Sequence, residues 1–293
     1  MESKIVIAHR GASGYLPEHT IPSKAMAYTM QPHYLEQDVV LSKDDVPIVI
    51  HDIHLDAVTN VSLVFPDRKR EDGRYYVIDF TFEELKKLEV FERIDIETGN
   101  SVFPKRFPKG KSRFGLHSLQ EEIELIQGLN QSTGNAIGIY PEIKNPAFHL
   151  KEGKDISTIV LNVLSEYGYQ SKKDNCILQC FDASELERIK TELKSDLFLV
   201  QLMEYETEVE SIPKYATYAD GIGPWIKLLN DEKLMELAKE YDLVVHAYTL
   251  RKDQLGENKG FDDLLNDVLY KSNVDGVFTD HPDAVLDYLK KKQ

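Results

Sequence analysis

The sequence predicts a (β/α)8 barrel, the TIM-barrel fold of the α/β class, with a small subdomain inserted after the hairpin that follows the second strand. Short apolar runs rich in β-branched residues alternate with amphipathic helical patterns, as in βα units around a parallel sheet. Eight such runs can be identified, and 293 residues are enough for the roughly 250 residues of a barrel plus one insertion. A doubly wound open sheet is the competing architecture.

The predicted strands extend from the N-terminus almost to the C-terminus, with helical patterns in most of the intervals. The strands are expected over Lys4 to His9, His33 to Asp38, Ile137 to Ile143, Cys176 to Phe181, Phe198 to Leu202, Ala219 to Gly223, Leu243 to Tyr248 and Gly276 to Thr279. The helices are expected over Ile21 to Met30, Ser118 to Leu129, Ile156 to Tyr167, Ala183 to Leu193 and Asp231 to Tyr241.

The interval from Ile53 to His117 interrupts this alternation, because it contains no clean βα unit and residues 65–74 are polar and rich in turn formers. Loops of this length without structure of their own are uncommon. We therefore expect residues 53–117 to form an inserted subdomain within a single catalytic domain of residues 1–293. A helix is predicted inside it, over Thr81 to Leu88.

Three predicted helix starts have the spacing of a capping box. In this motif a capping side chain and an acidic residue three positions later bind each other's backbone N–H groups. The pairs are Thr81 with Glu84, Ser118 with Glu121, and Asp182 with Glu185.

Composition argues against several classes of partner. The 50 acidic and 35 basic residues give a formal charge of -15, which repels nucleic acids and anionic membrane surfaces at long range. No run approaches the roughly 20 apolar residues of a transmembrane span, and the N-terminus lacks the pattern of a signal peptide. We therefore expect either a cytosolic protein or the mature part of an exported one.

The two cysteines, Cys176 and Cys180, fall on the same face of one predicted strand. Residues four apart on a strand are beyond ordinary bridging distance, which argues against a disulfide. We expect two buried thiols.

Polar residues follow the first two predicted strands at the edge where barrel enzymes carry their chemistry. His9 and Arg10 end the first strand, just before a glycine turn. In the second strand Glu36 and Asp38 project to the same face, because strand side chains alternate. Two carboxylates so close together repel each other unless a cation lies between them, and a hard divalent ion is the natural ligand.

Two further segments are expected to reach the same edge. Residues 39–52 form two β-prone runs around a Lys-Asp-Asp turn, which predicts a hairpin that returns His51 to the acidic pair. On the third barrel strand, Glu142 can complete the metal site and Lys144 adds a positive charge. The three carboxylates, a divalent cation and two basic groups leave one positive charge, which matches a phosphodiester.

Each of these residues also has a purely structural explanation. A histidine at a strand end is more often a hydrogen-bonded structural residue. A Glu-x-Asp strand usually presents a solvated face. Glu142 and Lys144 could form an ion pair of small energetic value. A functional site is favoured because four separate segments place titratable groups at the ends of apolar strands. Aromatic residues at strand ends, Phe181 and Tyr248 above all, are candidates for lining a substrate pocket, although most barrel aromatics fill the core.

Several strings of the sequence form one combined pattern. They are His9-Arg10-Gly11-Ala12-Ser13-Gly14-Tyr15-Leu16-Pro17-Glu18-His19-Thr20, Leu35-Glu36-Gln37-Asp38, His51-Asp52, Tyr140-Pro141-Glu142-Ile143-Lys144, Leu178-Gln179-Cys180-Phe181-Asp182, Asp220-Gly221-Ile222-Gly223-Pro224 and Phe278-Thr279-Asp280. Together they closely resemble the bacterial glycerophosphodiester phosphodiesterase family, particularly its periplasmic branch. The chain departs from that branch in a shorter segment over Met203 to Tyr218 and at Trp225-Ile226.

The resemblance implies a fold, a reaction and a set of residue roles. The fold is a TIM barrel with an insertion after the hairpin. The reaction cleaves glycerophosphodiesters such as glycerophosphocholine and glycerophosphoethanolamine to sn-glycerol 3-phosphate and an alcohol. The implied cofactor is Ca²⁺, with Mg²⁺ as a substitute, and the implied compartment is the periplasm; a homodimer is left open. The implied roles are acid–base catalysis for His9 and His51, metal ligation for Glu36, Asp38 and Glu142, and phosphate contact for Arg10 and Lys144.

The mechanism expected from these roles has two proton transfers. One histidine takes the proton of the glycerol hydroxyl and the other protonates the leaving alcohol, which gives a cyclic phosphate that water then opens. Ordinary imidazole pKa values near 6.5 would leave one ring neutral and one charged near neutral pH. Two rival functions remain: a barrel lyase or aldolase in which Lys144 forms a Schiff base, and a calcium-dependent binding protein without catalysis.

Overall fold

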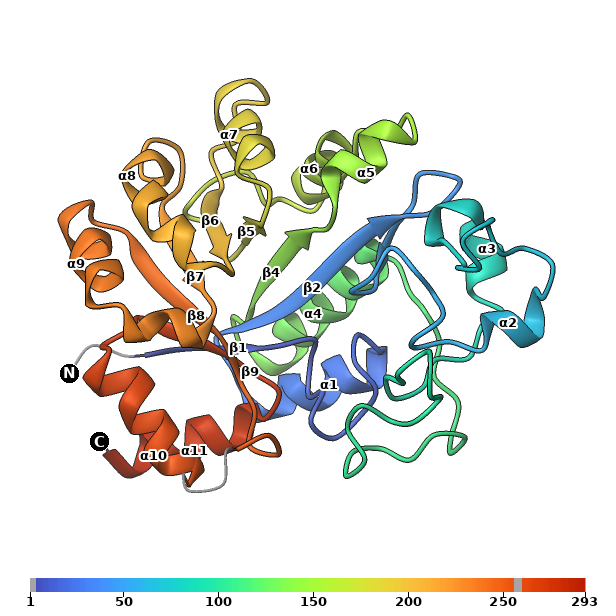
Figure 1. Ribbon diagram of the computed structural model, residues 1–293, viewed down its shortest axis with the longest axis horizontal. Coiled ribbons are helices and arrows are strands. Elements are labelled where there is room, and N and C mark those ends of the chain that lie inside the picture. The colour runs from blue at the N-terminus through green and yellow to red at the C-terminus, as the bar shows by residue number, and fades with distance from the viewer. Residues whose placement is uncertain (1–3, 256–259, 293) are drawn as a thin grey trace.

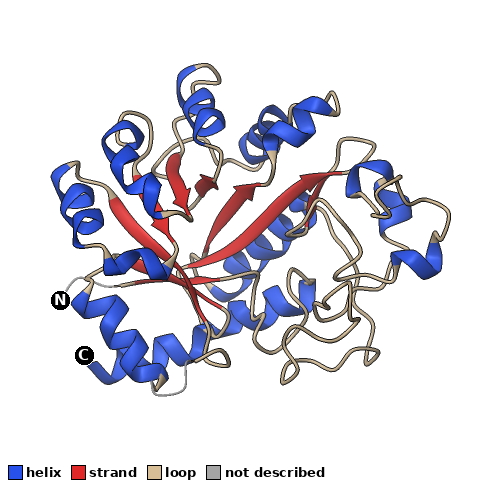
Figure 2. Ribbon diagram, viewed as in Figure 1, coloured by secondary structure: helices blue, strands red, loops and turns tan. Residues whose placement is uncertain are grey.

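The computed structural model describes residues 4–255 and 260–292. Its centre is a closed barrel of parallel strands, which confirms the predicted fold class (Figures 1 and 2). The strands follow the order β1-β9-β8-β7-β6-β5-β4-β2, and the pairing of β1 with β2 closes the ring. They are β1 (Ile5–Ala8), β2 (Tyr34–Leu41), β4 (Gly138–Ile143), β5 (Ile177–Cys180), β6 (Phe198–Met203), β7 (Gly221–Pro224), β8 (Val244–Leu250) and β9 (Gly276–Thr279).

All eight predicted strands are present, each within a few residues of its expected limits. Strands β4, β5, β7 and β9 are buried along their whole length, as expected for parallel strands covered on both faces. The predicted hairpin is also present, because β3 (Pro47–Val49) pairs antiparallel with the end of β2.

Helices surround the barrel (Figure 2). The helix α1 covers Ile21–Met30, as the sequence predicts. The other helices of the barrel are α4 (Leu119–Thr133), α5 (Pro146–Lys151), α6 (Ile156–Glu166), α7 (Ala183–Thr191), α8 (Ile212–Tyr215), α9 (Glu232–Glu240), α10 (Phe261–Asn266) and α11 (Pro282–Lys292), with short helical turns at Glu206–Ser211, Ile226–Asn230 and Asp267–Lys271.

Two of the three predicted capping boxes form, at Thr81 and Ser118. The third is wrong. Asp182 caps α7 through the backbone N–H groups of Ser184 and Glu185, but the Glu185 carboxylate does not return to the cap. It binds Ser157 and Arg188 instead, since these stronger partners lie within its reach.

The segment between the hairpin and α4 contains α2 (Val61–Val64), a short turn at Val77–Asp79 and α3 (Phe82–Leu85), and lies beside the end of β2 (Figure 1). Its apolar side chains form a cluster separate from the main core of the barrel, and Ile48 and Ile50 of the hairpin join this cluster. A separate cluster is what an inserted subdomain needs, although the limits 53–117 stay a prediction.

Both cysteines are free and buried, as predicted. Among the described residues, no helix combines the length and the apolar character that crossing a membrane requires.

Candidate active site

The loop after β1 directs two predicted site residues into the barrel mouth. Arg10 has a left-handed backbone conformation with φ 56°, and Gly11 follows with φ 92°. A side chain at Gly11 would meet the Ser23 hydroxyl at 2.6 Å, so this tight turn needs glycine. The turn aims the backbone N–H of Arg10 at Glu36 Oε2, at 2.7 Å.

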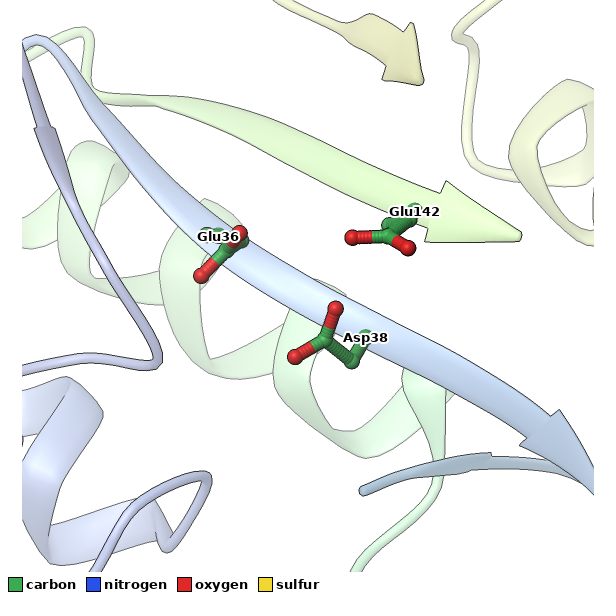
Figure 3. Close-up of side chains that lie close together, drawn as sticks. All are labelled: Glu36, Asp38 and Glu142. Atoms are coloured by element: carbon green, nitrogen blue, oxygen red, sulfur yellow. The ribbon is translucent and has the colours of Figure 1, made fainter. Parts of the chain in front are cut away.

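Three carboxylates meet where the middle of β2 lies beside the C-terminal end of β4 (Figure 3). Asp38 and Glu142 are directly paired in the register of the two strands, and Glu36 lies two residues before Asp38 on the same face. Ligand atoms of the three lie within 4.8 Å of one another, and all three residues are buried. The predicted acidic site is therefore one compact cluster, not a solvated face.

The carboxylates of this triad, Glu36, Asp38 and Glu142, have strongly displaced pKa values. Burial, Asp38 and Glu142 raise the pKa of Glu36 well above its usual value. Burial also raises the pKa of Glu142, to about 8. Although burial opposes it, Lys144 holds the pKa of Asp38 well below its usual value. Asp38 Oδ1 is buried without a hydrogen-bond partner among the described residues. The three carboxylates repel one another, and the raised pKa values show that protons would relieve this repulsion. A divalent cation can replace those protons, so the cluster fits a metal site.

Two basic groups flank the triad. Lys144 Nζ lies 2.7 Å from Glu142 Oε1 and 3.7 Å from Asp38 Oδ1. Arg10 Nε lies 3.5 Å from Asp38 Oδ2. The ion pair between Glu142 and Lys144 does form, but it is buried in the site and so is not a surface pair.

The two histidines are held in the same way by two aspartates. His9 Nδ1 lies 2.5 Å from Asp280 Oδ1, and His51 Nδ1 lies 2.6 Å from Asp52 Oδ1. A carboxylate on Nδ1 fixes the ring and leaves Nε2 for proton transfer. His9 Nε2 lies 3.9 Å from Glu36 Oε2, which places this ring beside the triad.

Burial and Arg10 lower the pKa of both histidines, with a net value of about 4 in each case. Asp280 opposes the effect at His9, and Asp38 and Asp52 oppose it at His51. With only the groups of the protein around them, both rings are therefore neutral near neutral pH, which differs from the expectation that one of them carries a proton. Sequence reasoning missed this because it could not measure how deeply the rings are buried.

All the predicted site residues line one cavity, which has about 520 Å³ of empty space. Phe181 and Tyr248 form part of its wall, with their rings edge to face at 5.8 Å between centroids. The predicted residues that the cavity brings together are His9, Arg10, Glu36, Asp38, His51, Glu142, Lys144, Phe181 and Tyr248.

A second, larger cavity adjoins the first and shares His51, Glu142, Lys144, Phe181 and Tyr248 with it. Its empty space is about 1150 Å³. The remaining wall includes Phe148 and Glu204. An extended substrate can therefore have one part beside the triad and another part in this outer cavity.

Sequence patterns alone indicate no role for Asp52 or Asp280. Asp280 directly follows β9, so the rule that selected His9 at the end of β1 could have selected it. Asp52 follows His51 at the end of the hairpin. Neither residue lines the first cavity, which is why a search for groups facing a substrate passes over them.

Comparison with known proteins identifies related sequences over nearly the whole chain. The model of the glycerophosphoryl diester phosphodiesterase family matches residues 9–284. A glycerophosphodiester phosphodiesterase from Haemophilus influenzae is 47% identical, over 98% of this chain and 90% of the relative. One from Treponema pallidum is 38% identical, over 98% of this chain and 92% of the relative.

Solved structures share the fold. An Oleispira antarctica phosphodiesterase, in complex with the product sn-glycerol-3-phosphate, has a TM-score of 0.71 at 21% identity and covers 98% of this chain and 96% of its own. A glycerophosphodiester phosphodiesterase from Agrobacterium tumefaciens has a TM-score of 0.65 at 18% identity, over 97% and 100%. The family model and the two sequence relatives go beyond fold, and they show that this chain belongs to the glycerophosphoryl diester phosphodiesterase family.

Proposed function

We propose that this phosphodiesterase cleaves glycerophosphodiesters to sn-glycerol 3-phosphate and an alcohol by acid–base catalysis with His9 and His51. The observation that carries the proposal is one cavity in which two aspartate-bound histidines stand beside a buried carboxylate triad. The product bound to the Oleispira antarctica phosphodiesterase supports the choice of product. Glycerophosphocholine and glycerophosphoethanolamine are the substrates that we expect.

The proposed metal ligands are Glu36, Asp38 and Glu142, and the proposed ion is Ca²⁺, with Mg²⁺ as a substitute. All three offer oxygen atoms, which hard divalent cations prefer. The raised pKa values of Glu36 and Glu142 and the unpartnered Asp38 Oδ1 support this assignment. A cation held there would supply Lewis acidity for the attack on phosphorus.

Arg10 and Lys144 are the proposed contacts of the phosphate. Their positive charges stand on either side of Asp38 at the mouth of the barrel. Buried cations beside a small cavity bind an anion more strongly than exposed ones, because solvent screens them less. Together with a divalent cation on the triad, they leave one positive charge for the single negative charge of a phosphodiester.

The two histidines carry the proposed proton transfers. One Nε2 takes the proton of the glycerol 2-hydroxyl as its oxygen attacks phosphorus, and the other gives a proton to the alcohol oxygen as its bond to phosphorus breaks. The cyclic phosphate is then opened by water with the roles of the histidines exchanged. A bound phosphodiester favours the protonated ring, because its negative charge offsets the cations that lower both histidine pKa values.

The outer cavity is the proposed place of the leaving alcohol. Phe148 and Phe181 contribute aromatic side chains to its wall, and Glu204 contributes a carboxylate. Aromatic rings and carboxylates attract a quaternary or primary ammonium group. This lining supports choline and ethanolamine esters as substrates.

The rival chemistry of a Schiff base at Lys144 is disfavoured. Although burial opposes it, Glu142 and Asp38 raise the pKa of Lys144 above its usual value. An amine that stays protonated is a poor nucleophile.

An assay with glycerophosphocholine, with and without a chelator, tests the proposal. We expect turnover that the chelator abolishes and Ca²⁺ restores. We expect His9→Ala and His51→Ala to lose turnover while still binding Ca²⁺. The matched control is His33→Gln at the other end of the barrel, where His33 accepts a hydrogen bond from the backbone of Val6. Near-normal rates in both catalytic variants would refute the assigned roles, and Ca²⁺-dependent substrate binding without turnover would favour the binding-protein alternative.

The periplasm is the proposed compartment, and a homodimer is the proposed assembly. The compartment rests on the resemblance of the sequence to the periplasmic branch, which leaves the oligomeric state open. Cell fractionation and light scattering test them separately, and cytoplasmic activity or a monomer in solution would contradict them.

A further inference from the structure

The segment after the hairpin sends two arginines, Arg93 and Arg106, toward the active site. Neither lines the cavity that contains the triad. The arginine side chains are only 17% and 3% exposed, so their charges are held inside the protein. Buried charges are rarely maintained without a partner, and the partners of these two connect them to the histidines.

Arg93 binds the aspartate that holds His51. Its Nη1 donates to Asp52 Oδ2 at 2.6 Å, while Asp52 Oδ1 faces His51 Nδ1. The same guanidinium donates from Nε and Nη2 to both oxygens of Glu18, at 3.1 and 2.6 Å. Glu18 in turn accepts from Arg10 Nη1. One arginine therefore fixes the partner of a histidine and, through Glu18, a proposed phosphate contact.

Arg106 binds the aspartate that holds His9. Its Nη2 donates to Asp280 Oδ2 at 2.7 Å, while Asp280 Oδ1 faces His9 Nδ1. It also donates from Nη1 to the backbone oxygen of Ser13, in the loop after β1. Asp280 has a second arginine, because Arg251 Nε donates to Oδ2 at 2.8 Å.

The same three-residue arrangement thus occurs twice, as histidine, aspartate and arginine. In each case the histidine and the aspartate lie at the barrel mouth, and the arginine comes from the segment after the hairpin. The two copies differ in support. Asp280 is 2% exposed and has Arg251 in addition, whereas Asp52 is 28% exposed and has Arg93 as its one arginine partner in the part of the chain that the structure describes.

We propose that Arg93 and Arg106 are positioning residues, through which the inserted segment sets the orientation of both catalytic histidines. An arginine on the outer oxygen of each aspartate fixes the carboxylate, and the carboxylate then fixes the tautomer and the angle of the ring. Small errors in such angles reduce rates strongly, since proton transfer needs short, aligned contacts. The inference rests on the proposed acid–base roles of His9 and His51.

The first test compares Arg93→Met and Arg93→Lys with the wild type. We expect Arg93→Met to lower kcat by about 10- to 100-fold, the usual effect of removing a partner behind a functional ligand. We expect KM to change less, and Arg93→Lys to recover part of the loss. The control is Arg74→Met, which removes another partly exposed ion pair of the segment, with Asp56; Arg74 has no ion pair with Asp52 or Asp280 in the described part of the chain. We expect this control to keep the wild-type kcat.

The pH profile of kcat separates positioning from a loss of folded protein. Removing the Arg93 cation lets His51 keep its proton to higher pH, so the limb of the profile that His51 controls moves upward in pH in Arg93→Met. This is the acid limb for a base and the alkaline limb for an acid. Arg93→Lys keeps the charge, and the same limb stays near that of the wild type. A purely structural role of Arg93 would reduce the amplitude of the profile and leave the limb in place.

Arg106→Met provides the internal comparison. Because Asp280 retains Arg251, we expect a smaller loss of kcat per folded molecule than in Arg93→Met, and the folded fraction is measured by circular dichroism. The proposal is overturned if folded Arg93→Met keeps the wild-type kcat, or if its rate falls only with the folded fraction and neither limb of the profile moves. Those results would contradict the positioning role but not the proposed hydrolysis. Wild-type rates in His9→Ala and His51→Ala would instead contradict the proposed catalytic roles on which this inference rests.

Discussion

Two clusters of buried charge lie on opposite faces of strand β2, and they differ in how well their charges are partnered. On the inner face, Glu36 and Asp38 contribute to the carboxylate triad. On the outer face, Gln37 hydrogen-bonds to Glu122 of α4. Because side chains alternate along a strand, three consecutive residues serve both clusters.

The outer cluster has a partner for each oxygen of its carboxylate. Glu122 Oε1 lies 2.9 Å from Lys24 Nζ and accepts from Gln37 at 2.8 Å, while Oε2 lies 2.6 Å from His117 Nε2. Although burial opposes it, Lys24 and His117 lower the pKa of Glu122 to about 2. This cluster holds α1 and α4 against the barrel.

The inner cluster holds more carboxylates than the nearby cations can neutralise. The pKa values of Glu36 and Glu142 are raised, and Asp38 Oδ1 lacks a hydrogen bond within the described residues. Fully partnered buried charge contributes to the fold, and underpartnered buried charge creates a place for a ligand. The comparison predicts that changes in the two clusters have opposite consequences.

Lys24→Met should be the most damaging change to stability. It leaves the buried Glu122 carboxylate without its ammonium partner, which costs about 3–5 kcal/mol. Denaturant unfolding measures the loss, and the rate per folded molecule should stay near that of the wild type. Unchanged stability in Lys24→Met would mean that the outer cluster does not hold the fold.

Glu142→Gln should have the reverse effect. Since losing a residue behind a metal ligand already reduces function 10- to 100-fold, losing a proposed ligand should lower turnover by more than about 100-fold. The variant should be at least as stable as the wild type in the presence of a chelator, because one repelling carboxylate is gone. Steady-state assays measure the turnover and thermal melts measure the stability. A variant that is active but destabilised would contradict the role assigned to the inner cluster.

The two clusters should also respond oppositely to pH. The folded pKa of Glu122 is lowered, so its contribution to stability is present above its usual value of 4.5 and is lost as pH falls through about 2. The folded pKa of Glu142 is raised, so its contribution is present below 4.5 and is lost as pH rises through about 8.

The free energy of unfolding, measured as a function of pH in the presence of a chelator, tests both the acidic and the alkaline loss of stability. Glu142→Gln should reduce the alkaline loss, leaving the part that the raised pKa of Glu36 contributes, and keep the acidic loss. An alkaline loss of equal size in the variant would contradict the assignment.

Gln37→Leu should have the smallest effect. It removes hydrogen bonds to Glu122, to the Leu35 backbone and from the Tyr140 backbone, all of them buried. We expect a loss of about 1–3 kcal/mol, in line with unsatisfied buried groups. Urea unfolding against the wild type measures it, and a neutral result would show that water replaces the amide.

Much of the site follows from strand periodicity alone. Alternation along β2 and β4 places Glu36, Asp38 and Glu142 on one face, and the hairpin turn returns His51 to them. These rules depend only on residues that are close together in the chain, so they can be applied to a single sequence. The fold follows for the same reason, from eight apolar runs and the helices between them.

The rest depends on contacts between distant segments. Arg93 and Arg106 come from irregular backbone, where no periodicity indicates direction, and each reaches an aspartate through tertiary packing. The low histidine pKa values depend on depth of burial, which the sequence does not display. The capping box predicted at Asp182 fails because Ser157 and Arg188 take the Glu185 carboxylate.

Calorimetric titration of the metal-free protein with Ca²⁺ tests whether the carboxylate triad is the metal site. We expect one site per chain in the wild type, and loss of that site in both Asp38→Asn and Glu142→Gln, with His9→Ala retaining it. Absence of binding in the wild type, or undiminished binding in the two carboxylate variants, would show that the triad is not the metal site.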